Sequence, residues 1–362
     1  PFPYPAPMDR EAGIEAYQAM ITAEAYQAKS ASGAQDHLHL YQSDQESPVI
    51  QMIVDGVTAC AGGVKKYRLV AANGLDLPVW TAGAHLDIVV APEFLRQYSM
   101  CGDPADRSCY EIAVLIELEG RGGSKLMHRI FEQGRRVFVS KPINHFGLEG
   151  QASLSLLFGG GIGVTPMIAF AHELDRSRRD FKLMYSASTL ASAAFDGVFE
   201  AQPWAAKTSK YYSDQGSRLD VAAAVPAYAP GIHIYVCGPD SYMSAILDHA
   251  RIIGYPDAAL HAEFFNVPDV PDWVNLPFEI ERSNGQRLAV SAEQSASDAL
   301  IAAGIPVDVK CSDGLCGVCK CTLISGEVEH RDFVLSAAQR ETTIILCQSR
   351  SLQENGVLKL DI

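Results

Sequence analysis

The chain has 362 residues, of which 48% are hydrophobic and 20% are charged, and its formal net charge at pH 7 is −14. At roughly 100–200 residues per domain, this length predicts two or three domains with packed cores. The negative charge argues against nucleic acid and anionic membranes as partners, because both attract proteins of the opposite sign. No secretory leader and no apolar run of about twenty residues is found, so we expect a cytoplasmic protein that binds no membrane.

Residues 1–47 are interpreted as an N-terminal extension that is partly helical. Residues 10–30 are rich in Ala, Glu and Gln, and Ile14, Tyr17, Ile21 and Tyr26 recur roughly along one helical face. Such a segment could dock on the rest of the chain, bind a protein partner or mediate self-association. The pattern favours none of these three roles.

Residues 48–150 read as a small antiparallel β-barrel. Short alternating strands separated by Gly- and Pro-rich turns are typical of that fold, and they are expected at 50–54, 66–71, 85–90, 96–101, 110–118 and 136–140. Two motifs lie inside this region, Arg96-Gln-Tyr98-Ser99 and Gly120-Arg-Gly-Gly-Ser124. Taken alone, the first motif could equally be an ion-paired edge strand with an outward-facing aromatic residue.

Residues 151–265 begin with an apolar strand at 153–158 that runs into a glycine-rich turn at 159–163. A helix is expected to begin near Pro166 with Thr165 as its N-cap, since both residue types favour helix starts. A glycine-rich turn at a helix N-terminus presents N–H groups and a positive dipole end to a pyrophosphate. By itself this signal is weak, because tight turns need glycine whatever they bind.

Two further strands strengthen the nucleotide interpretation of this region. They are expected at 181–186 and 233–237, and the second ends in Cys237-Gly238-Pro239 before a helix at 241–252. Alternating strands and helices predict a parallel sheet whose ligands bind at the C-terminal strand ends. The turns at 159–166 and 237–239 would then lie on one edge and form a nucleotide site.

Residues 266–276 form a proline-rich linker, and residues 277–362 carry the most specific motif of the chain. Cys311, Cys316, Cys319 and Cys347 have the plant-type ferredoxin spacing C-x4-C-x2-C with a distant fourth cysteine, which predicts a [2Fe–2S] cluster. Zinc is the main alternative, but structural zinc sites favour two separate C-x2–4-C pairs. Glycines at 314 and 317 would allow the backbone to approach the sulfur atoms with unusual φ values.

The other cysteines have simpler interpretations. Cys321 follows Cys319 in an expected strand at 320–324, so its side chain should point away from the cluster. Cys60, Cys101 and Cys109 are expected to be small buried residues. Their spacing suggests no disulfide framework, and nine cysteines in a chain of this length fit a reducing compartment.

The order of barrel, nucleotide sheet and ferredoxin motif is similar to that of the ferredoxin–NADP reductase superfamily, in particular the phthalate dioxygenase reductase family. The resemblance covers roughly residues 48–362. Its markers also include Glu263-Phe264-Phe265 and the segment 329–332, Glu-His-Arg-Asp. It implies a multidomain protein: an antiparallel β-barrel flavin domain that binds FMN, an α/β parallel-sheet domain that binds NADH, and an α+β β-grasp ferredoxin domain with a [2Fe–2S] cluster.

The resemblance also implies roles for individual residues. Tyr98 would pack against the isoalloxazine, and Ser99 would lie near flavin N5. The FMN phosphate would be held by Arg96, Gly122, Gly123 and Ser124, and Ala113 and Val114 would also contact the flavin. Cys237 would line the nicotinamide C4 position, while Phe265 would cover the flavin face, although a core aromatic is the alternative for Phe265. The remaining residues assigned to the nucleotide are Gly160, Gly161, Gly163, Val164, Thr165, Pro166, Gly238 and Pro239.

The function implied is that of a reductase component of a multicomponent oxygenase. A nicotinamide releases two electrons as hydride, a cluster accepts one, and a flavin can do both. The expected acceptor is a terminal Rieske non-haem iron oxygenase that acts on an aromatic or amine compound and binds transiently. A cytochrome P450 acceptor and a non-turnover redox sensor or carrier are the alternatives. NADH is favoured over NADPH, because no arginine follows Ser188 before Lys207.

Overall fold

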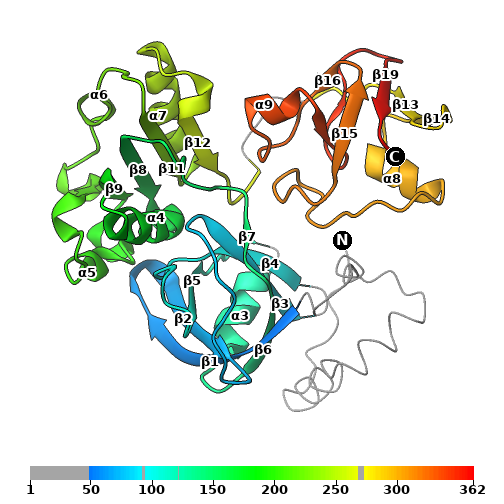
Figure 1. Cartoon of the computed structure of the whole chain (residues 1–362). Helices are drawn as coiled ribbons and strands as arrows, with labels where there is room; N and C mark the ends of the chain where they lie inside the picture. Colours follow the sequence, from blue (N-terminus) through cyan, green and yellow to red (C-terminus); the bar gives the residue numbers. More distant parts are fainter. Residues whose placement is uncertain (1–48, 92–93, 121, 268–272) are drawn as a thin grey trace.

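A computed structural model describes residues 49–91, 94–120, 122–267 and 273–362 of the chain. The described strands form three lobes, with the β-barrel in blue and cyan, the parallel sheet in green and the C-terminal lobe in yellow to red (Figure 1). The helix expected at 10–30 lies outside the described residues. No helix in the described part of the chain combines the length and apolar character needed to cross a membrane.

The barrel is a seven-stranded antiparallel sheet with the strand order β4-β3-β6-β1-β2-β5, and β7 pairs with β3. Its strands are β1 (Val49–Ala59), β2 (Val64–Ala71), β3 (Ala84–Ala91), β4 (Phe94–Ser99), β5 (Tyr110–Leu115), β6 (Arg136–Ser140) and β7 (Ile143–Asn144). A bridge between Met100 and Ile112 joins the end of β4 to β5. The helix α3 (Gly123–Ile130) packs against this sheet through Met127, which is fully buried.

The strand expected at 110–118 ends earlier, at Leu115. The reason is local: the N–H of Glu117 donates to the Ser124 hydroxyl, 3.0 Å away, and not to a neighbouring strand. The chain therefore turns toward α3 at the point where the sequence pattern still reads as a strand.

The second lobe is a parallel sheet of five strands with the order β10-β9-β8-β11-β12. Its strands are β8 (Leu154–Gly160), β9 (Asp180–Ala187), β10 (Thr208–Tyr212), β11 (Ile232–Cys237) and β12 (Leu260–Glu263), and its longer helices are α4 (Thr165–Arg176) and α7 (Asp240–Ile252). The expected parallel sheet is confirmed. The edge strands β10 and β12 were not predicted, because they are short and carry polar residues such as Lys210 and His261.

The start of α4 differs from the sequence prediction. Thr165 already has helical φ and ψ values of −55° and −50°, and Val164 is the N-cap, so the prediction of Thr165 as N-cap is wrong. A 3-10 turn over Gly161–Val164 leads directly into the helix and leaves no extended residue for a capping hydroxyl. The Thr165 hydroxyl instead donates to the carbonyl of Ile162, 3.0 Å away.

The C-terminal lobe is a mixed sheet with the order β14-β13-β19-β15-β17, in which β13 and β19 are parallel, and a small two-stranded sheet, β16-β18. Its elements are β13 (Phe278–Arg282), β14 (Arg287–Val290), α8 (Ala296–Ala302), β15 (Lys320–Ser325), β16 (Val328–Glu329), α9 (Ala337–Arg340), β17 (Thr343–Ile345), β18 (Arg350–Ser351) and β19 (Val357–Leu360). Leu300 of α8 packs into the same core as Ile280 and Leu358. The predicted three-part fold class is confirmed.

Short helices complete the described chain. They are η2 (Ala61–Gly63), η3 (Gly161–Val164), η4 (Leu190–Ser192), α5 (Asp196–Phe199), η5 (Ala205–Lys207), η6 (Ser213–Gln215), α6 (Val221–Ala224) and η7 (Asp257–Ala259). All nine cysteines lie in described segments and are free thiols. Cys101 and Cys109 are buried as expected, whereas Cys60 is only half-buried.

Candidate electron-transfer site

The four predicted cluster ligands come together in the C-terminal lobe. Cys311, Cys316 and Cys319 lie in the loop before β15, and Cys347 follows β17. Their thiols form one continuous series of contacts, in which Cys311 contacts Cys316 and Cys347, and Cys347 also contacts Cys319. The contact with Cys316, followed by that with Cys347, lowers the pKa of Cys311. Within the described residues, no three metal-ligating side chains surround a single-ion position. Four thiols gathered in one place fit a [2Fe–2S] cluster, which four cysteine thiolates would hold.

The backbone of the cluster loop confirms the reason given for its glycines. Gly314 and Gly317 have φ values of 75° and 67°, and Ser312 has a φ of 59°. The N–H of Asp313 donates to the Cys311 sulfur, 3.4 Å away. Left-handed residues thus turn backbone N–H groups toward a ligand sulfur, as a cluster requires.

Cys321 is separate from these ligands. It lies on β15 opposite Ile344, and its sulfur faces the carbonyl oxygen of Asp361, 4.0 Å away. Burial raises its pKa to about 11, so it is a protonated thiol at neutral pH.

Arg96 and the start of α3 form a cradle on the barrel. Gly122 has a φ of 94° and is the N-cap of α3, so the first N–H groups of the helix are exposed to a ligand. A Cβ atom on Gly123 would lie only 2.4 Å from Nε of Arg96. The guanidinium therefore lies directly over the helix start, an arrangement that fits a phosphate dianion.

The Gly123→Ala variant tests this cradle. The added methyl group must displace the Arg96 guanidinium, which sits at the end of a flexible side chain, so the free energy of unfolding should change little. Flavin affinity, measured by titrating the flavin-depleted protein, should fall by roughly tenfold or more, as for the loss of a charge-assisted contact worth about 1.5–3 kcal/mol. Gly150→Ala is the matched control, because no atom lies within 4 Å of its Cβ position. Equal flavin affinity in both variants would contradict the assignment.

Residues of the barrel and the parallel sheet meet at a second point. Ser99, at the end of β4, donates its hydroxyl to Oε2 of Glu263, 2.9 Å away, at the end of β12. Glu263 is the register partner of Cys237 on β11, and Cys237 is paired with Gly159 on β8. The hydroxyl, the thiol and the carboxylate thus come from strand ends of two lobes.

Burial sets the electrostatics of this group. It raises the pKa of Glu263 to about 7, against the opposing effect of the Ser99 hydrogen bond. It also raises the pKa of Cys237 well above its usual value, so this thiol is protonated. Glu263 is therefore the member of the group that changes charge near neutral pH.

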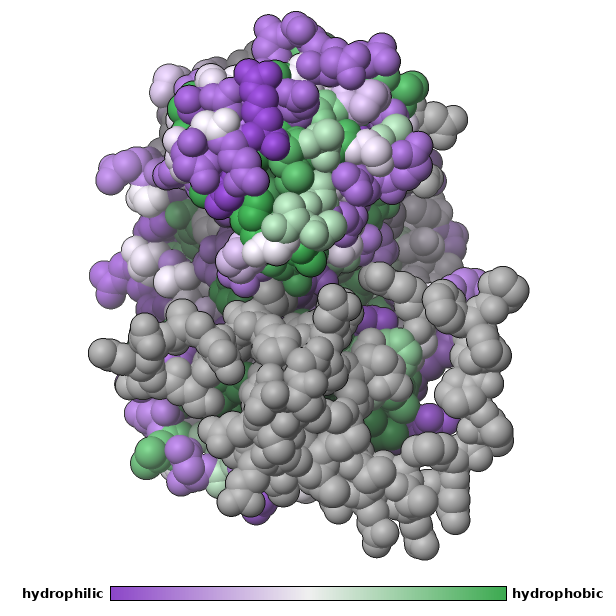
Figure 2. Space-filling model, turned by 90° about the vertical axis from the view of Figure 1, so that its right-hand side faces the viewer, coloured by the Kyte–Doolittle hydropathy of each residue, from purple (hydrophilic) through white to green (hydrophobic). Residues whose placement is uncertain are grey.

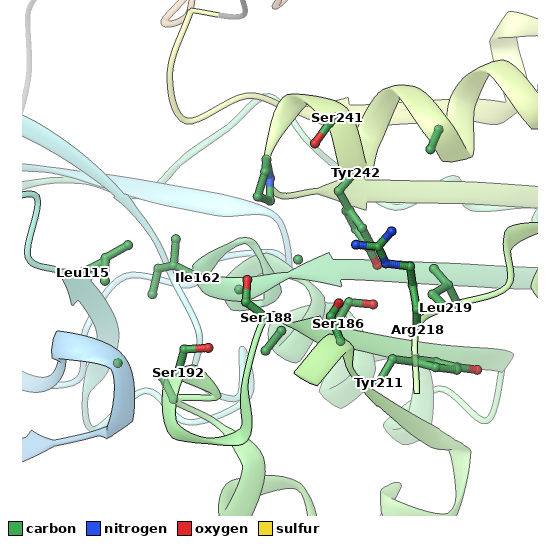
Figure 3. Close-up of a pocket in the computed structure, with 18 of the residues that line it drawn as sticks. Leu115, Ile162, Ser186, Ser188, Ser192, Tyr211, Arg218, Leu219, Ser241 and Tyr242 are labelled. Atoms are coloured by element: carbon green, nitrogen blue, oxygen red, sulfur yellow. The ribbon is translucent and has the colours of Figure 1, made fainter. Parts of the chain in front are cut away.

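A cavity of about 550 Å³ lies between the barrel and the parallel sheet (Figure 3). Gly62, Val64 and Leu115 line it from the barrel side. From the sheet side it is lined by three predicted nucleotide residues, Gly160, Gly161 and Pro239, and also by Ser186, Ser188, Tyr211, Arg218, Ser241 and Tyr242. The cavity runs along the C-terminal edge of a parallel sheet, where such folds bind dinucleotides.

Other predicted nucleotide residues are not among those that line the cavity. Gly163, Val164, Thr165 and Pro166 are buried. A Cβ atom on Gly163 would lie 2.4 Å from the carbonyl oxygen of Cys237, so only glycine allows the two turns to touch. Gly238 is buried less deeply and is next to Pro239, which lines the cavity.

The remaining predicted flavin contacts lie on β5, on β4 and just after β12. Ala113 and Val114 lie on β5 and are 4% and 0% exposed. Tyr98 is half-buried against the barrel core. Phe265 is 39% exposed, whereas its neighbour Phe264 contacts the ring of Phe333 in the C-terminal lobe, with ring centres 5.3 Å apart.

Sequence reasoning missed two residues of the site. Glu263 was noted only as a family marker, and nothing in its local sequence indicates a bond to Ser99. Arg218 was missed because an arginine was sought directly after β9, whereas it follows β10 and points into the cavity (Figure 3). No acidic side chain among the described residues pairs with Arg218.

Comparisons with known proteins agree with this geometry. The family model for the 2Fe-2S iron-sulfur cluster binding domain matches residues 278–352. The vanillate O-demethylase oxidoreductase of Pseudomonas sp. (strain HR199 / DSM 7063) is 37% identical over 318 residues, which cover 87% of this chain and 100% of that protein.

Two solved structures resemble the whole arrangement. The chain superposes on an intact type IV self-sufficient cytochrome P450 monooxygenase with a TM-score of 0.78 and 30% identity, over 94% of this chain and 44% of the longer one. It superposes on phthalate dioxygenase reductase, a modular structure for electron transfer from pyridine nucleotides to [2Fe-2S], with a TM-score of 0.62 and 31% identity, over 87% and 98% of the two chains. The chain belongs to the phthalate dioxygenase reductase family.

Proposed function

We propose that the chain is the NADH-dependent reductase component of a multicomponent oxygenase. The observation that carries the proposal is the contact of Ser99 with Glu263 beside Cys237. It supports a hydride-transfer site between the two lobes that would bind flavin and nicotinamide. A protein that only stored or sensed electrons would need the cluster and would have no use for such a site.

Each cofactor has candidate residues. Arg96 with Gly122, Gly123 and Ser124 would hold the FMN phosphate, and Tyr98 would flank its ring system. Bound FMN converts a two-electron hydride into single electrons, which is the conversion a [2Fe–2S] cluster requires. NADH would occupy the cavity with its nicotinamide toward Cys237. The four cysteines of the C-terminal lobe would hold the cluster.

The acceptor we favour is a terminal Rieske oxygenase that acts on an aromatic or amine compound. Plant-type clusters have potentials near −400 mV and Rieske centres about −150 mV or higher, so one-electron transfer is downhill by roughly 5 kcal/mol or more. Exposed apolar side chains at Ile301, Ile324 and Leu352 offer contact area on the C-terminal lobe. In the view of Figure 2, an apolar area surrounded by polar residues is visible on the upper part of the molecule.

A haem protein is the second candidate acceptor. It is favoured by the likeness to the reductase part of the self-sufficient cytochrome P450. The two candidates are distinguished by adding the reduced protein to a Rieske oxygenase and to a P450, and by following Rieske absorbance in one case and the carbon monoxide difference spectrum in the other. Faster reduction of the P450 would favour the second candidate.

The first test is an anaerobic titration of the purified protein with NADH, with the released flavin identified by chromatography. Loss of both flavin and iron–sulfur absorbance at substoichiometric NADH, with FMN released, is the expected result. A cluster that stays oxidised while the flavin is reduced would favour the sensor or carrier function instead.

Two further expectations from the sequence stay predictions. They are the cytoplasmic location and the domain boundaries at residues 48, 151, 266 and 277.

Arg218 leads to a prediction about cofactor choice. Its guanidinium lines the cavity together with Ser186 and Ser188, where a 2′-phosphate on the adenosine would find a cation. We expect NADPH to reduce the protein as well, with a lower kcat/KM than NADH. Arg218→Gln should lower kcat/KM for NADPH by roughly tenfold and leave that for NADH within about twofold, because one charge-assisted contact is lost. An equal loss for both cofactors would show that Arg218 binds a group common to them.

A further inference from the structure

One ion pair joins the C-terminal lobe to the barrel in the protein interior. Nζ of Lys310 contacts Oδ1 of Asp87, and the two side chains are only 5% and 2% exposed. The residues are 223 positions apart in the chain. Lysine and aspartate are almost never this buried unless they are paired, so the pair is built into the contact between the two lobes.

The positions of the two residues link the cluster ligands to the candidate flavin strand. Lys310 is covalently next to the cluster ligand Cys311. Asp87 lies on β3 and is the register partner of Gln97 on β4, between Arg96 and Tyr98. The pair therefore connects the residue before Cys311 to β3, the strand that pairs with β4, which carries the candidate flavin contacts Arg96 and Tyr98.

Among the described side chains that the structure places beside the pair, the histidines are neutral, whereas Lys310 is a cation in direct contact with Asp87. Nε2 of His85 lies 3.9 Å from Oδ1 of Asp87 and 2.9 Å from Nε2 of Gln97. Burial lowers the pKa of His85 to about 4, so its ring is neutral. His145, beyond β7, interacts with the backbone of Cys316, and burial lowers its pKa as well. The positive charge of Lys320, in the C-terminal lobe, also lowers the pKa of His145. The N–H of Asp87 donates to the Ser140 hydroxyl, 3.0 Å away, which fixes β3 at this point.

We propose that Asp87 and Lys310 are positioning residues that hold the cysteine loop against β3, beside the candidate flavin strand β4, for intramolecular electron transfer. This proposal rests on the proposed function, because it assumes that both cofactors are bound. Removing Asp87 leaves the buried Lys310 ammonium without its carboxylate partner, and removing Lys310 takes a buried cation away from Asp87, so in both cases the lobes should separate locally to hydrate the remaining charge. Transfer between cofactors depends on their separation, and a displacement of about 1 Å in a positioned site can change a rate by up to about 100-fold.

The experiment uses the holoprotein and three variants, Lys310→Met, Asp87→Asn and Lys310→Arg. Stopped-flow mixing with NADH separates the rate of flavin reduction from the later rate of cluster reduction. We expect flavin reduction within about twofold of the wild type, and cluster reduction at least roughly tenfold slower, in Lys310→Met and Asp87→Asn. Lys310→Arg keeps the charge and should retain most of the rate. Lys359→Met is the control, because it breaks a more exposed pair with Glu281, 3.1 Å long, inside the C-terminal lobe.

A second measurement does not depend on turnover. Hydrogen exchange of the peptides 84–91 and 305–311 should become faster in Lys310→Met and Asp87→Asn and stay unchanged in Lys359→Met. Unchanged cluster reduction in Asp87→Asn, together with unchanged exchange, overturns the proposal. A slowed cluster reduction in Lys310→Met alone also overturns it, since the effect would then be local to Cys311. If NADH reduces no wild-type flavin, the proposed function fails, while the exchange measurement still tests the contact.

Discussion

Cys347→Ser is expected to abolish the [2Fe–2S] cluster while NADH still reduces the flavin. Cys347 is the predicted fourth ligand, and its sulfur contacts those of Cys311 and Cys319. Losing a direct ligand should lower NADH-driven reduction of cytochrome c by roughly 100-fold or more, beyond the 10–100-fold typical of losing an outer-shell partner. Iron content, the visible spectrum of the cluster and cytochrome c reduction measure the loss, and ferricyanide reduction measures what the flavin still delivers.

The matched control for this variant is Cys321→Ser. Cys321 lies two residues from the ligand Cys319, but its sulfur faces the Asp361 carbonyl on the other side of β15. We therefore expect Cys321→Ser to keep its iron and its cluster spectrum. If Cys321→Ser lost the cluster and Cys347→Ser kept it, the ligand set would have to be reassigned.

The C-terminal lobe could be predicted most completely because its chemistry is local in sequence. Three predicted ligands lie within nine residues, and the glycines at 314 and 317 stand where the loop has positive φ values. Spacing alone therefore indicated the cluster. The fourth ligand, Cys347, was included because the plant-type pattern allows a distant cysteine.

The nucleotide region could be predicted only in part. Glycine-rich turns after apolar strands indicated the edge of the sheet, and Gly160, Gly161 and Pro239 line the cavity. The edge strand β10 has polar residues and no clear period, so its existence was missed, and with it the position of Arg218. The start of α4 was misplaced because a 3-10 turn occupies the position where a capping residue was expected.

Contacts between lobes could not be predicted from one sequence. The bond from Ser99 to Glu263 joins residues 164 positions apart, and the pair of Asp87 with Lys310 joins residues 223 positions apart. Local periodicity carries no information at such separations, because it reports only which face of an element is buried. Both contacts depend on how the three lobes pack together.

Glu263 gives the second prediction, which concerns pH. Its pKa is raised from 4.5 to about 7, so the carboxyl is neutral below pH 7 and ionised above it. An ionised carboxylate beside Cys237 repels the negative charge that a hydride carries. It also keeps the Ser99 hydroxyl donating its hydrogen bond to Glu263. The rate of flavin reduction by NADH should therefore fall as pH rises from about 6 to 8. The fall should be roughly tenfold, since a group with a pKa of 7 passes from about 90% to about 10% protonated.

The Glu263→Gln variant should show a flat rate over the same range, because the amide stays neutral. The free energy of unfolding should change with pH in the same direction as the rate. Because the pKa of Glu263 is raised, its contribution to stability is fully present below pH 4.5 and is lost as pH rises through about 7. Glu263→Gln should remove that slope, whereas Glu354→Gln, an exposed carboxylate, should keep both wild-type profiles. A rate that still falls through pH 7 in Glu263→Gln would assign the titration to another group. In that case the bond to Ser99 would be structural, and hydride transfer would not depend on the charge at the end of β12.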